Sequence, residues 1–455
     1  MKKRHLLFLT SLAATSIVAQ QKPNIVFIIA DDCRRLDLGC YGSPDAITPN
    51  IDKLAQEGLN FNKFFQATAM SSPTRHCLLP GLYPVKSGAY PNHTFIKDGI
   101  KTLPYYLNEA GYRVAHQGKR HIAPLESFPF QYLDDNKVKK GNHDIIIDHV
   151  EPFIAEVAKS KEPFFLYLAS TEPHSPWTKG DHSLFDPDKI TLPPNLVDTK
   201  ETRRQYANYL AEINYMDNHI GKVDALIEKY GLADNTIFIF TSEQGYSFPF
   251  AKWTCYDAGL QTGFIVRWKG VIKPGSQTDA MCEYVDVTPT LIDIAGGRVP
   301  KDVDGKSFLP VIKGKKDKFK EYAYGIQTSR GIFSGPEYYG VRSVRNDKYS
   351  YIVNLTPDAE FKCTSAIKRD KVWNSWLQRA ETDDFARQQT TLFKKRPAEE
   401  LYDVVNDPFQ MRNLASDPQY AKIIKTMRGK LEKWMKGQGD KGQETEMQAK
   451  EHQLH

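Results

Sequence analysis

Four short apolar runs constrain the fold of this chain more than any other feature. They occupy residues 24–30 (NIVFIIA), 112–116 (YRVAH), 163–169 (PFFLYLA) and 236–241 (TIFIFT). Their length and their β-branched and aromatic content are typical of strands buried on both faces. Helical patterns separate them, and the clearest covers residues 202–229, where apolar side chains recur at alternating steps of three and four. The alternation predicts an α/β sandwich with a mostly parallel central sheet.

A cluster of polar residues follows each of the four runs at once. In an open α/β sheet, ligands bind outside the carboxyl ends of the strands, so these clusters are expected to converge on one edge of the sheet. The expected site is therefore assembled from four distant segments of the chain. They are Asp31-Asp32, Gly118-Lys119-Arg120-His121, Glu172-Pro173-His174 and Glu243-Gln244-Gly245.

The alternation of buried strands and helices ends at about residue 320. Short β-like segments appear at residues 339–344 and 349–354, and Asp417-Pro418 has the form of a helix N-cap followed by a first-turn proline. We therefore expect a catalytic domain over residues 21–320 and a smaller C-terminal α+β subdomain over residues 321–436. Residues 437–455 are polar and rich in glycine, which predicts a disordered tail.

The N-terminus has the pattern of a secretory signal peptide. A basic start, Met1-Lys2-Lys3-Arg4, precedes an apolar run over residues 6–18 that is too short to span a bilayer. This pattern predicts that residues 1–20 are removed on export and that the protein is periplasmic or secreted, without an integral membrane segment. The net charge of +6 suits an anionic substrate, and no nucleic-acid-binding motif is found. The six cysteines form no CxxC pair, and export permits disulfides without identifying a pairing.

Residues 71–81, Ser71-Ser72-Pro73-Thr74-Arg75-His76-Cys77-Leu78-Leu79-Pro80-Gly81, have the form S-x-P-x-R-x-x-x-L-P-G. Read by itself, a short S-x-P-x-R string is more simply a proline-containing turn before a short helix. Cys77 does not begin such an element, because Leu79 and Gly81 stand where Pro and Arg are required. Cys77 is better read as a buried structural thiol.

With these residues the chain resembles the type I, formylglycine-dependent sulfatases of the serine type, and the resemblance extends over about residues 23–436. The segment 118–124 (GKRHIAP) and residues 401–414 are most similar to the heparan N-sulfatase (sulfamidase) branch, which includes bacterial polysaccharide sulfatases. The resemblance implies an alkaline-phosphatase-like fold. One departure is the pair Glu243-Gln244, where most relatives have Asp-Asn or Asp-His.

The resemblance also implies the roles of the clustered residues. Ser71 is expected to be oxidised to formylglycine by a maturation enzyme, and a calcium ion, rather than magnesium, is expected beside it. The expected metal ligands are Asp31, Asp32, Ser71, Glu243 and Gln244. The expected catalytic residues are Arg75, which steadies the formylglycine hydrate; Lys119 and Lys252, which neutralise the sulfate oxygens; His121, which orients the hydrate; and His174, the general acid.

The expected activity is hydrolysis of sulfate groups on a sulfated carbohydrate, of the ulvan type or a glycosaminoglycan such as heparan. The sequence leaves open O-sulfate or N-sulfate, and exo or endo attack. Two alternatives remain: a phosphatase or phosphodiesterase on the same scaffold, and a non-catalytic protein that binds sulfated glycans. Weaker candidates for sugar contacts are Arg34, Arg35, Asp181, His182, Trp253 and Arg342.

Overall fold

The computed structural model describes residues 21–134, 144–332, 337–362 and 371–454, and its centre is an eight-stranded sheet. The strand order is β10-β2-β9-β7-β1-β6-β4-β5, and the block from β7 to β5 is parallel throughout. β9 runs antiparallel to both of its neighbours. The mostly parallel sheet is therefore as predicted. Its strands are β1 (Asn24–Ala30), β2 (Leu59–Phe61), β4 (Arg113–Gly118), β5 (Gln131–Tyr132), β6 (Phe164–Ala169), β7 (Thr236–Ser242), β9 (Phe264–Trp268) and β10 (Ser276–Thr278).

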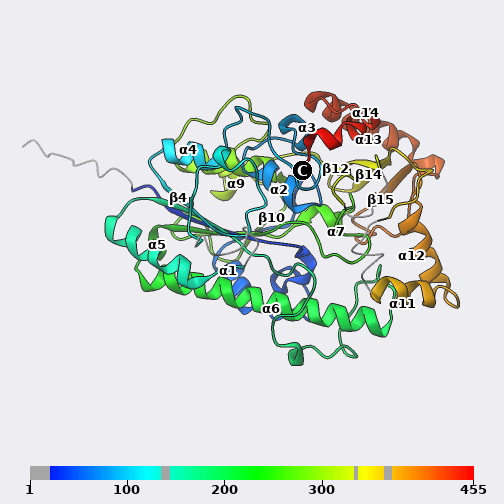
Figure 1. The fold of residues 1–455 in the computed structure, drawn as a ribbon, viewed down its shortest axis with the longest axis horizontal. Coiled ribbons are helices and arrows are strands. Elements are labelled where there is room, and N and C mark those ends of the chain that lie inside the picture. The colour runs from blue at the N-terminus through cyan, green and yellow to red at the C-terminus, as the bar shows by residue number, and fades with distance from the viewer. Residues whose placement is uncertain (1–20, 135–143, 333–336, 363–370, 455) are drawn as a thin grey trace, which may run out of the picture.

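Helices cover both faces of this sheet, so the domain has three layers (Figure 1). Alternate side chains of β1 enter different apolar clusters: Val26 and Ile28 face one, and Ile25 and Phe27 face the other. The first cluster is closed by α1 (Pro49–Glu57), α5 (Ile147–Ser160) and the long α6 (Lys200–Lys229). The second is closed by α2 (Ser71–Leu78), α4 (Leu103–Glu109), α8 (Val287–Ile294) and α9 (Leu309–Ile312).

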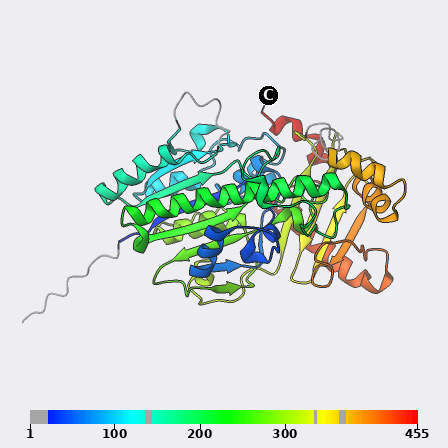
Figure 2. The ribbon, with the colours of Figure 1, turned by 90° about the horizontal axis from the view of Figure 1, so that it is seen from below.

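The C-terminal subdomain is built on a four-stranded antiparallel sheet in the order β12-β13-β14-β15. It lies beside the carboxyl ends of the central strands, at one end of the molecule (Figures 1 and 2). Trp376 anchors it by donating its indole N–H to Thr202 Oγ1 on α6, at 2.9 Å. Its elements are β12 (Ala323–Thr328), β13 (Gly340–Arg345), β14 (Tyr349–Asn354), β15 (Glu399–Asp403), α11 (Lys371–Arg379), α12 (Asp384–Lys394) and α13 (Ala421–Gln438).

Smaller elements join these two parts. A three-stranded sheet contains β3 (Phe64–Phe65), β8 (Gln261–Thr262) and β11 (Cys282–Glu283), and two short helices are α3 (Pro84–Ser87) and α7 (Asp257–Leu260). The expected helix start at Asp417 is present, because its side chain accepts the Gln419 N–H at the start of a 3-10 turn that leads into α13.

The prediction of a disordered tail is wrong for residues 437–454. This segment contains α14 (Gln443–Met447) and a 3-10 turn over Ala449–His452. It is fixed by a buried ion-pair network in which Arg342 contacts Asp440 and Glu446. Composition suggested disorder because the segment is polar, but its buried charges are paired. The expected signal peptide, residues 1–20, and residue 455 lie outside the described residues. Within the described ranges, no helix is both long and apolar enough to cross a membrane.

Candidate active site

The four polar clusters meet at the carboxyl ends of β1, β4, β6 and β7, as predicted. Backbone hydrogen bonds tie the loops that leave these strands to one another. Asp31 N donates to Glu172 O at 3.0 Å, Glu243 N donates to Ala30 O at 2.9 Å, and Lys119 N donates to Ala169 O at 2.8 Å. The side chains after the strands therefore start from a fixed common edge, on the side of the sheet that faces the C-terminal subdomain (Figure 1).

Ser71 reaches this edge from α2, of which it is the first residue. Its side chain is nearly buried, and Ser71 Oγ donates a hydrogen bond to Asp31 Oδ1 at 2.8 Å. Arg75 is one helical turn further along, so it lies on the same face of α2 as Ser71. The spacing of four residues in the motif thus places both side chains toward the ends of the central strands.

The amide of Gln244 lies where three oxygens converge. Its Nε2 is 2.8 Å from Ser71 Oγ, 2.8 Å from Asp32 Oδ1 and 3.3 Å from Asp31 Oδ1. The other amide atom, Gln244 Oε1, is buried and has no hydrogen-bond partner within the described residues. Because the two ends of an amide exchange by rotation, Oε1 can be turned toward the same point.

These residues fit a hard divalent cation. Glu243 Oε2 is a second buried oxygen without a hydrogen-bond partner in the described ranges, and the carboxylates of Asp31 and Asp32 are buried as well. Oxygen-only donors favour calcium or magnesium. No group of three or more His, Cys, Asp or Glu side chains suited to a metal is present in the described part of the chain. A cation here would therefore need the Gln244 amide and the oxygen of residue 71 among its ligands.

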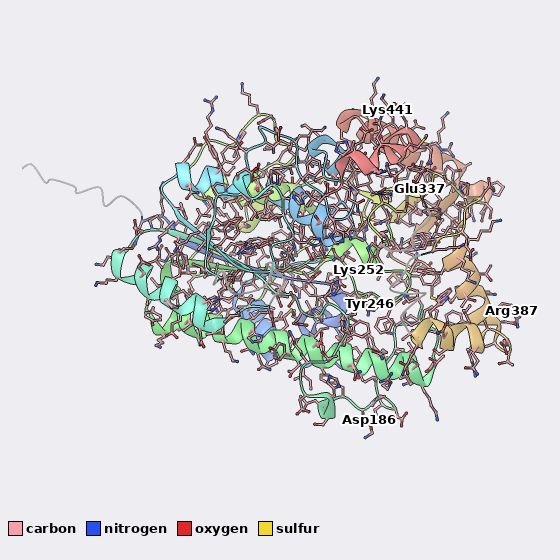
Figure 3. All side chains as sticks on the ribbon, viewed as in Figure 1. Asp186, Tyr246, Lys252, Glu337, Arg387 and Lys441 are labelled. Carbon is pink, nitrogen blue, oxygen red and sulfur yellow. The ribbon has the colours of Figure 1, made fainter. Side chains whose placement is uncertain are left out.

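Two lysines face the aspartate pair. Lys119 contacts Asp31, and Lys252 Nζ lies 2.6 Å from Asp32 Oδ2. Both lysines are almost completely buried, and burial lowers the pKa of Lys119 to about 8. Figure 3 shows Lys252 near the middle of the molecule, whereas Arg387 and Lys441 lie at its periphery. The site thus combines two acids with two buried cations, an arrangement that can hold an anion next to a metal.

Arg75 and Glu243 form a separate, fully buried ion pair at 3.1 Å. Arg75 also donates to the backbone oxygen of Lys119 at 3.2 Å. Burial by itself lowers the pKa of Arg75, but the Glu243 carboxylate together with Tyr167 and Tyr284 outweighs burial, so the net pKa is raised. Glu243 therefore contacts Arg75 directly, whereas Gln244 contacts the aspartates and Ser71.

The two predicted histidines approach from different loops. His174 Nε2 is 3.7 Å from Asp32 Oδ2, and the charge of Lys252 together with burial lowers the pKa of His174 to about 4. His121 is held close to Lys119 and Arg75, and burial followed by those two charges keeps its pKa well below the usual value. Its Nε2 contacts His93 Nδ1 at 3.1 Å.

Several weaker candidates have structural partners instead. Arg342 is fully buried in its network with Asp440 and Glu446, so the sugar-contact hypothesis is wrong for it. Arg34 pairs with Asp37, and Asp181 accepts the Ser183 N–H. Cys77 is a buried free thiol, as predicted.

One residue near this site was missed by the sequence reasoning. His93 lies in the segment Tyr90-Pro91-Asn92-His93-Thr94, which matches no motif and follows no predicted strand. Only its contact with His121 reveals it. The sequence offers no signal for such a contact beyond the presence of a histidine in a loop.

Comparison with known families gives two matches along the chain. Residues 23–297 match the model described as sulfatase. Residues 243–361 match the model described as N-sulphoglucosamine sulphohydrolase, C-terminal. The first match includes all ten predicted site residues, and the second begins at Glu243 and extends into the C-terminal subdomain.

Individual proteins resemble the chain over nearly its whole length. An ulvan-active sulfatase of Formosa agariphila is 34% identical over 436 residues, covering 94% of this chain and 83% of that protein. The human N-sulphoglucosamine sulphohydrolase is 26% identical, covering 90% of this chain and 89% of that protein. The crystal structure of a putative sulfatase from Bacteroides fragilis shares the fold with a TM-score of 0.72 and 22% identity, covering 96% of this chain and 99% of that one.

Proposed function

This chain belongs to the sulfatase family, and on that premise we propose that it is an exported hydrolase of sulfated polysaccharides or their oligosaccharides. It uses a formylglycine made from Ser71 by a maturation enzyme, together with a calcium ion. The observation that carries the proposal is the position of Ser71 Oγ, 2.8 Å from Asp31 Oδ1 and 2.8 Å from the Gln244 amide, inside a cluster that also holds Lys119 and Lys252.

The chain's own residues supply binding and orientation. Lys119 and Lys252 place positive charge on the two sides of the aspartate pair, where they would neutralise the equatorial oxygens of a sulfate group. Arg75 lies one turn after residue 71 on α2, and its ion pair with Glu243 holds the guanidinium in a fixed position. His174 Nε2 lies 3.7 Å from Asp32 Oδ2 and is the group placed to give a proton to the leaving oxygen or nitrogen, which requires that the negative charge of a bound sulfate offset Lys252, the main cause of the low His174 pKa.

Two groups complete this machinery. Formylglycine at position 71 would supply a hydrated aldehyde, whose hydroxyl serves as the nucleophile toward sulfur. Asp31, Asp32, Glu243, Gln244 and the oxygen of residue 71 would hold a calcium ion, which would supply positive charge beside the nucleophile. The calcium site is supported by the oxygen donors of this cluster, including the two buried oxygens of Glu243 and Gln244 that lack partners among the described residues.

The substrate class rests on the relatives and on charge. The relatives are named for ulvan and for N-sulphoglucosamine, two different sulfated carbohydrates. The net charge of +6 suits polyanions of this kind. We therefore propose a sulfated sugar unit as the substrate and extend the proposal to both O-sulfate and N-sulfate groups. Export to the periplasm or beyond is consistent with the location of such polymers outside the cell.

The proposal is tested by sulfate release from a panel of defined sulfated oligosaccharides. We expect release from at least one member, abolished by Ser71→Ala with the melting temperature unchanged. Cys77→Ser, in the same helix, is the matched control and should retain activity, because its side chain is outside the cluster. Unchanged turnover in Ser71→Ala would exclude the nucleophile. Binding of the same oligosaccharides without any release would instead favour a non-catalytic glycan-binding protein.

A further inference from the structure

His93 stands at the edge of the active site, where it contacts one of the predicted catalytic residues. Its side chain is exposed, and its Nδ1 lies 3.1 Å from Nε2 of the largely enclosed His121, with ring centroids 5.1 Å apart. Both residues have left-handed backbones, with φ of 55° at His93 and 45° at His121. Non-glycine residues seldom adopt this conformation, so the surrounding structure must hold both of them in place.

The C-terminal segment holds the His93 loop. Residues 452–454 run antiparallel to it and form an isolated β-bridge between Thr94 and Gln453. Leu454 N donates to His93 O at 2.8 Å, and Thr94 Oγ1 donates to the backbone oxygen of His452 at 2.7 Å. On the other side, Thr94 N donates to Ser72 Oγ at 3.3 Å, next to the predicted nucleophile. The loop is thus fixed between the chain's last described residues and the start of α2.

A loop of the C-terminal subdomain completes this support. Gln453 bridges two segments, because its Oε1 accepts from Arg330 Nε at 2.8 Å and its Nε2 donates to Asn92 O at 3.2 Å. Asn92 N in turn donates to Arg330 O at 3.1 Å. Gly331 has φ of 79°, and a Cβ added there would lie 2.5 Å from Asn92 O and 2.6 Å from Gln453 Nε2. The three segments are therefore packed too closely for any other residue at position 331.

The segment carrying Gln453 is itself anchored in the protein interior. Arg342 pairs with Asp440 and Glu446, all three being buried. Tyr90, three residues before His93, donates its hydroxyl hydrogen to Thr445 O at 2.9 Å. Its ring packs against the His452 ring, with the two ring centroids 5.0 Å apart. Residues 440–454 thus connect a buried charge network to the loop that carries His93.

We propose that His93 is a positioning residue for His121, and that residues 440–454 act as the strap that keeps it in place. A neutral imidazole has one N–H and one acceptor nitrogen, and the partner of one nitrogen decides the state of the other. His121 Nδ1 is buried and has no hydrogen-bond partner in the described ranges, so it is the nitrogen that remains for reacting groups. When His93 Nδ1 accepts the His121 Nε2 proton, His121 Nδ1 is left as a proton acceptor.

This inference rests on the proposed function for its kinetic test, and it also has a readout independent of turnover. His93→Ala removes the acceptor, whereas His93→Asn places an amide oxygen where Nδ1 stands and tolerates a left-handed backbone. We expect His93→Ala to lower kcat about tenfold or more with little change in KM, because proton transfer in the transition state loses its oriented base. His93→Asn should recover most of the loss.

The independent readout is the nitrogen NMR spectrum of histidine-labelled protein, in which the His121 signals are identified by their absence in His121→Gln. We expect the wild type to show His121 protonated at Nε2, and His93→Ala to show a shifted or mixed tautomer. An unchanged His121 tautomer together with unchanged kcat in His93→Ala would overturn the inference. A wild type that releases no sulfate would refute the proposed function, while the spectrum still tests the inference.

The strap is tested by Gln453→Ala, with Met447→Ala as the matched control in the same segment, because the Met447 side chain is 59% exposed. Gln453→Ala should lower kcat and shift the His121 signals in the same direction as His93→Ala, with the melting temperature nearly unchanged. Met447→Ala should change neither. If Gln453→Ala behaves like Met447→Ala, residues 440–454 do not act as a strap for His93.

Discussion

Replacing Glu243 with glutamine removes one charge from the buried Arg75–Glu243 pair while keeping the shape of the side chain. Both residues are fully buried and their charged atoms are 3.1 Å apart. Removing one partner of a buried ion pair costs about 3 to 5 kcal/mol, because the other charge is left uncompensated. Glutamine still offers Arg75 an acceptor oxygen, so we expect a loss at the lower end, about 3 kcal/mol.

The expected shift in melting temperature follows from the size of the chain. An unfolding entropy of about 2.1 cal/mol/K per residue, over 455 residues, gives about 1 kcal/mol/K. Glu243→Gln should therefore lower the melting temperature by about 3 °C. The measurement is differential scanning calorimetry in the presence of a calcium chelator, because Glu243 is also a proposed calcium ligand and the chelator isolates the ion pair.

A double-mutant cycle supplies the control. In Arg75→Met combined with Glu243→Leu, both charges are gone, so the loss should be smaller than the sum of the two single losses by about 3 kcal/mol. A melting temperature of Glu243→Gln equal to that of the wild type would refute the reasoning. Strict additivity in the cycle would refute it as well, because it would mean that the two charges are not coupled.

Three other perturbations have defined outcomes. Burial lowers the pKa of His76 from 6.5 to about 4, so between these pH values the unfolded chain binds a proton that the folded chain does not. About 3 kcal/mol of folding stability is therefore present above pH 6.5 and should be lost as the pH falls to 4. Urea titrations of His76→Gln at several pH values should lack this loss. Asp32→Ala should abolish sulfate release and the calcium-dependent rise in melting temperature seen in thermal-shift assays; an equal rise in the variant would exclude Asp32 as a ligand. Arg342→Met leaves Asp440 and Glu446 buried without their counter-ion, so it should cost about 3 to 5 kcal/mol in chemical denaturation and expose residues 440–454 to limited proteolysis; resistance equal to that of the wild type would contradict this.

The sequence was a good guide wherever a local pattern determines the structure. Residues 24–30 form β1 with the predicted bounds, because Asn24 is followed by six apolar residues and the run is buried on both faces in the middle of the sheet. The long helix was predicted from residue 202 and begins at Lys200, since the stripe of apolar residues marks its buried face. The placement of Asp31, Lys119 and Gln244 at one edge follows from the parallel order of their strands.

The sequence was a poor guide wherever a contact depends on residues far apart in the chain. It did not distinguish Glu243 from Gln244, and only the structure places one against Arg75 and the other against Ser71. The polar composition of residues 437–455 suggested disorder, yet Glu446 on α14 is fully buried because Arg342 on β13 neutralises it. The contact of His93 with His121 is of the same kind, since it joins two loops with no shared motif.

The oxidation state of residue 71 tests the central claim most directly. Trypsin should release residues 64–75 as one peptide, and its mass can be measured on protein purified from the native host. The account predicts a loss of two hydrogens relative to serine, seen as the aldehyde or as its hydrate, in a preparation that releases sulfate. A preparation that releases sulfate while every copy of residue 71 is unmodified serine would contradict it.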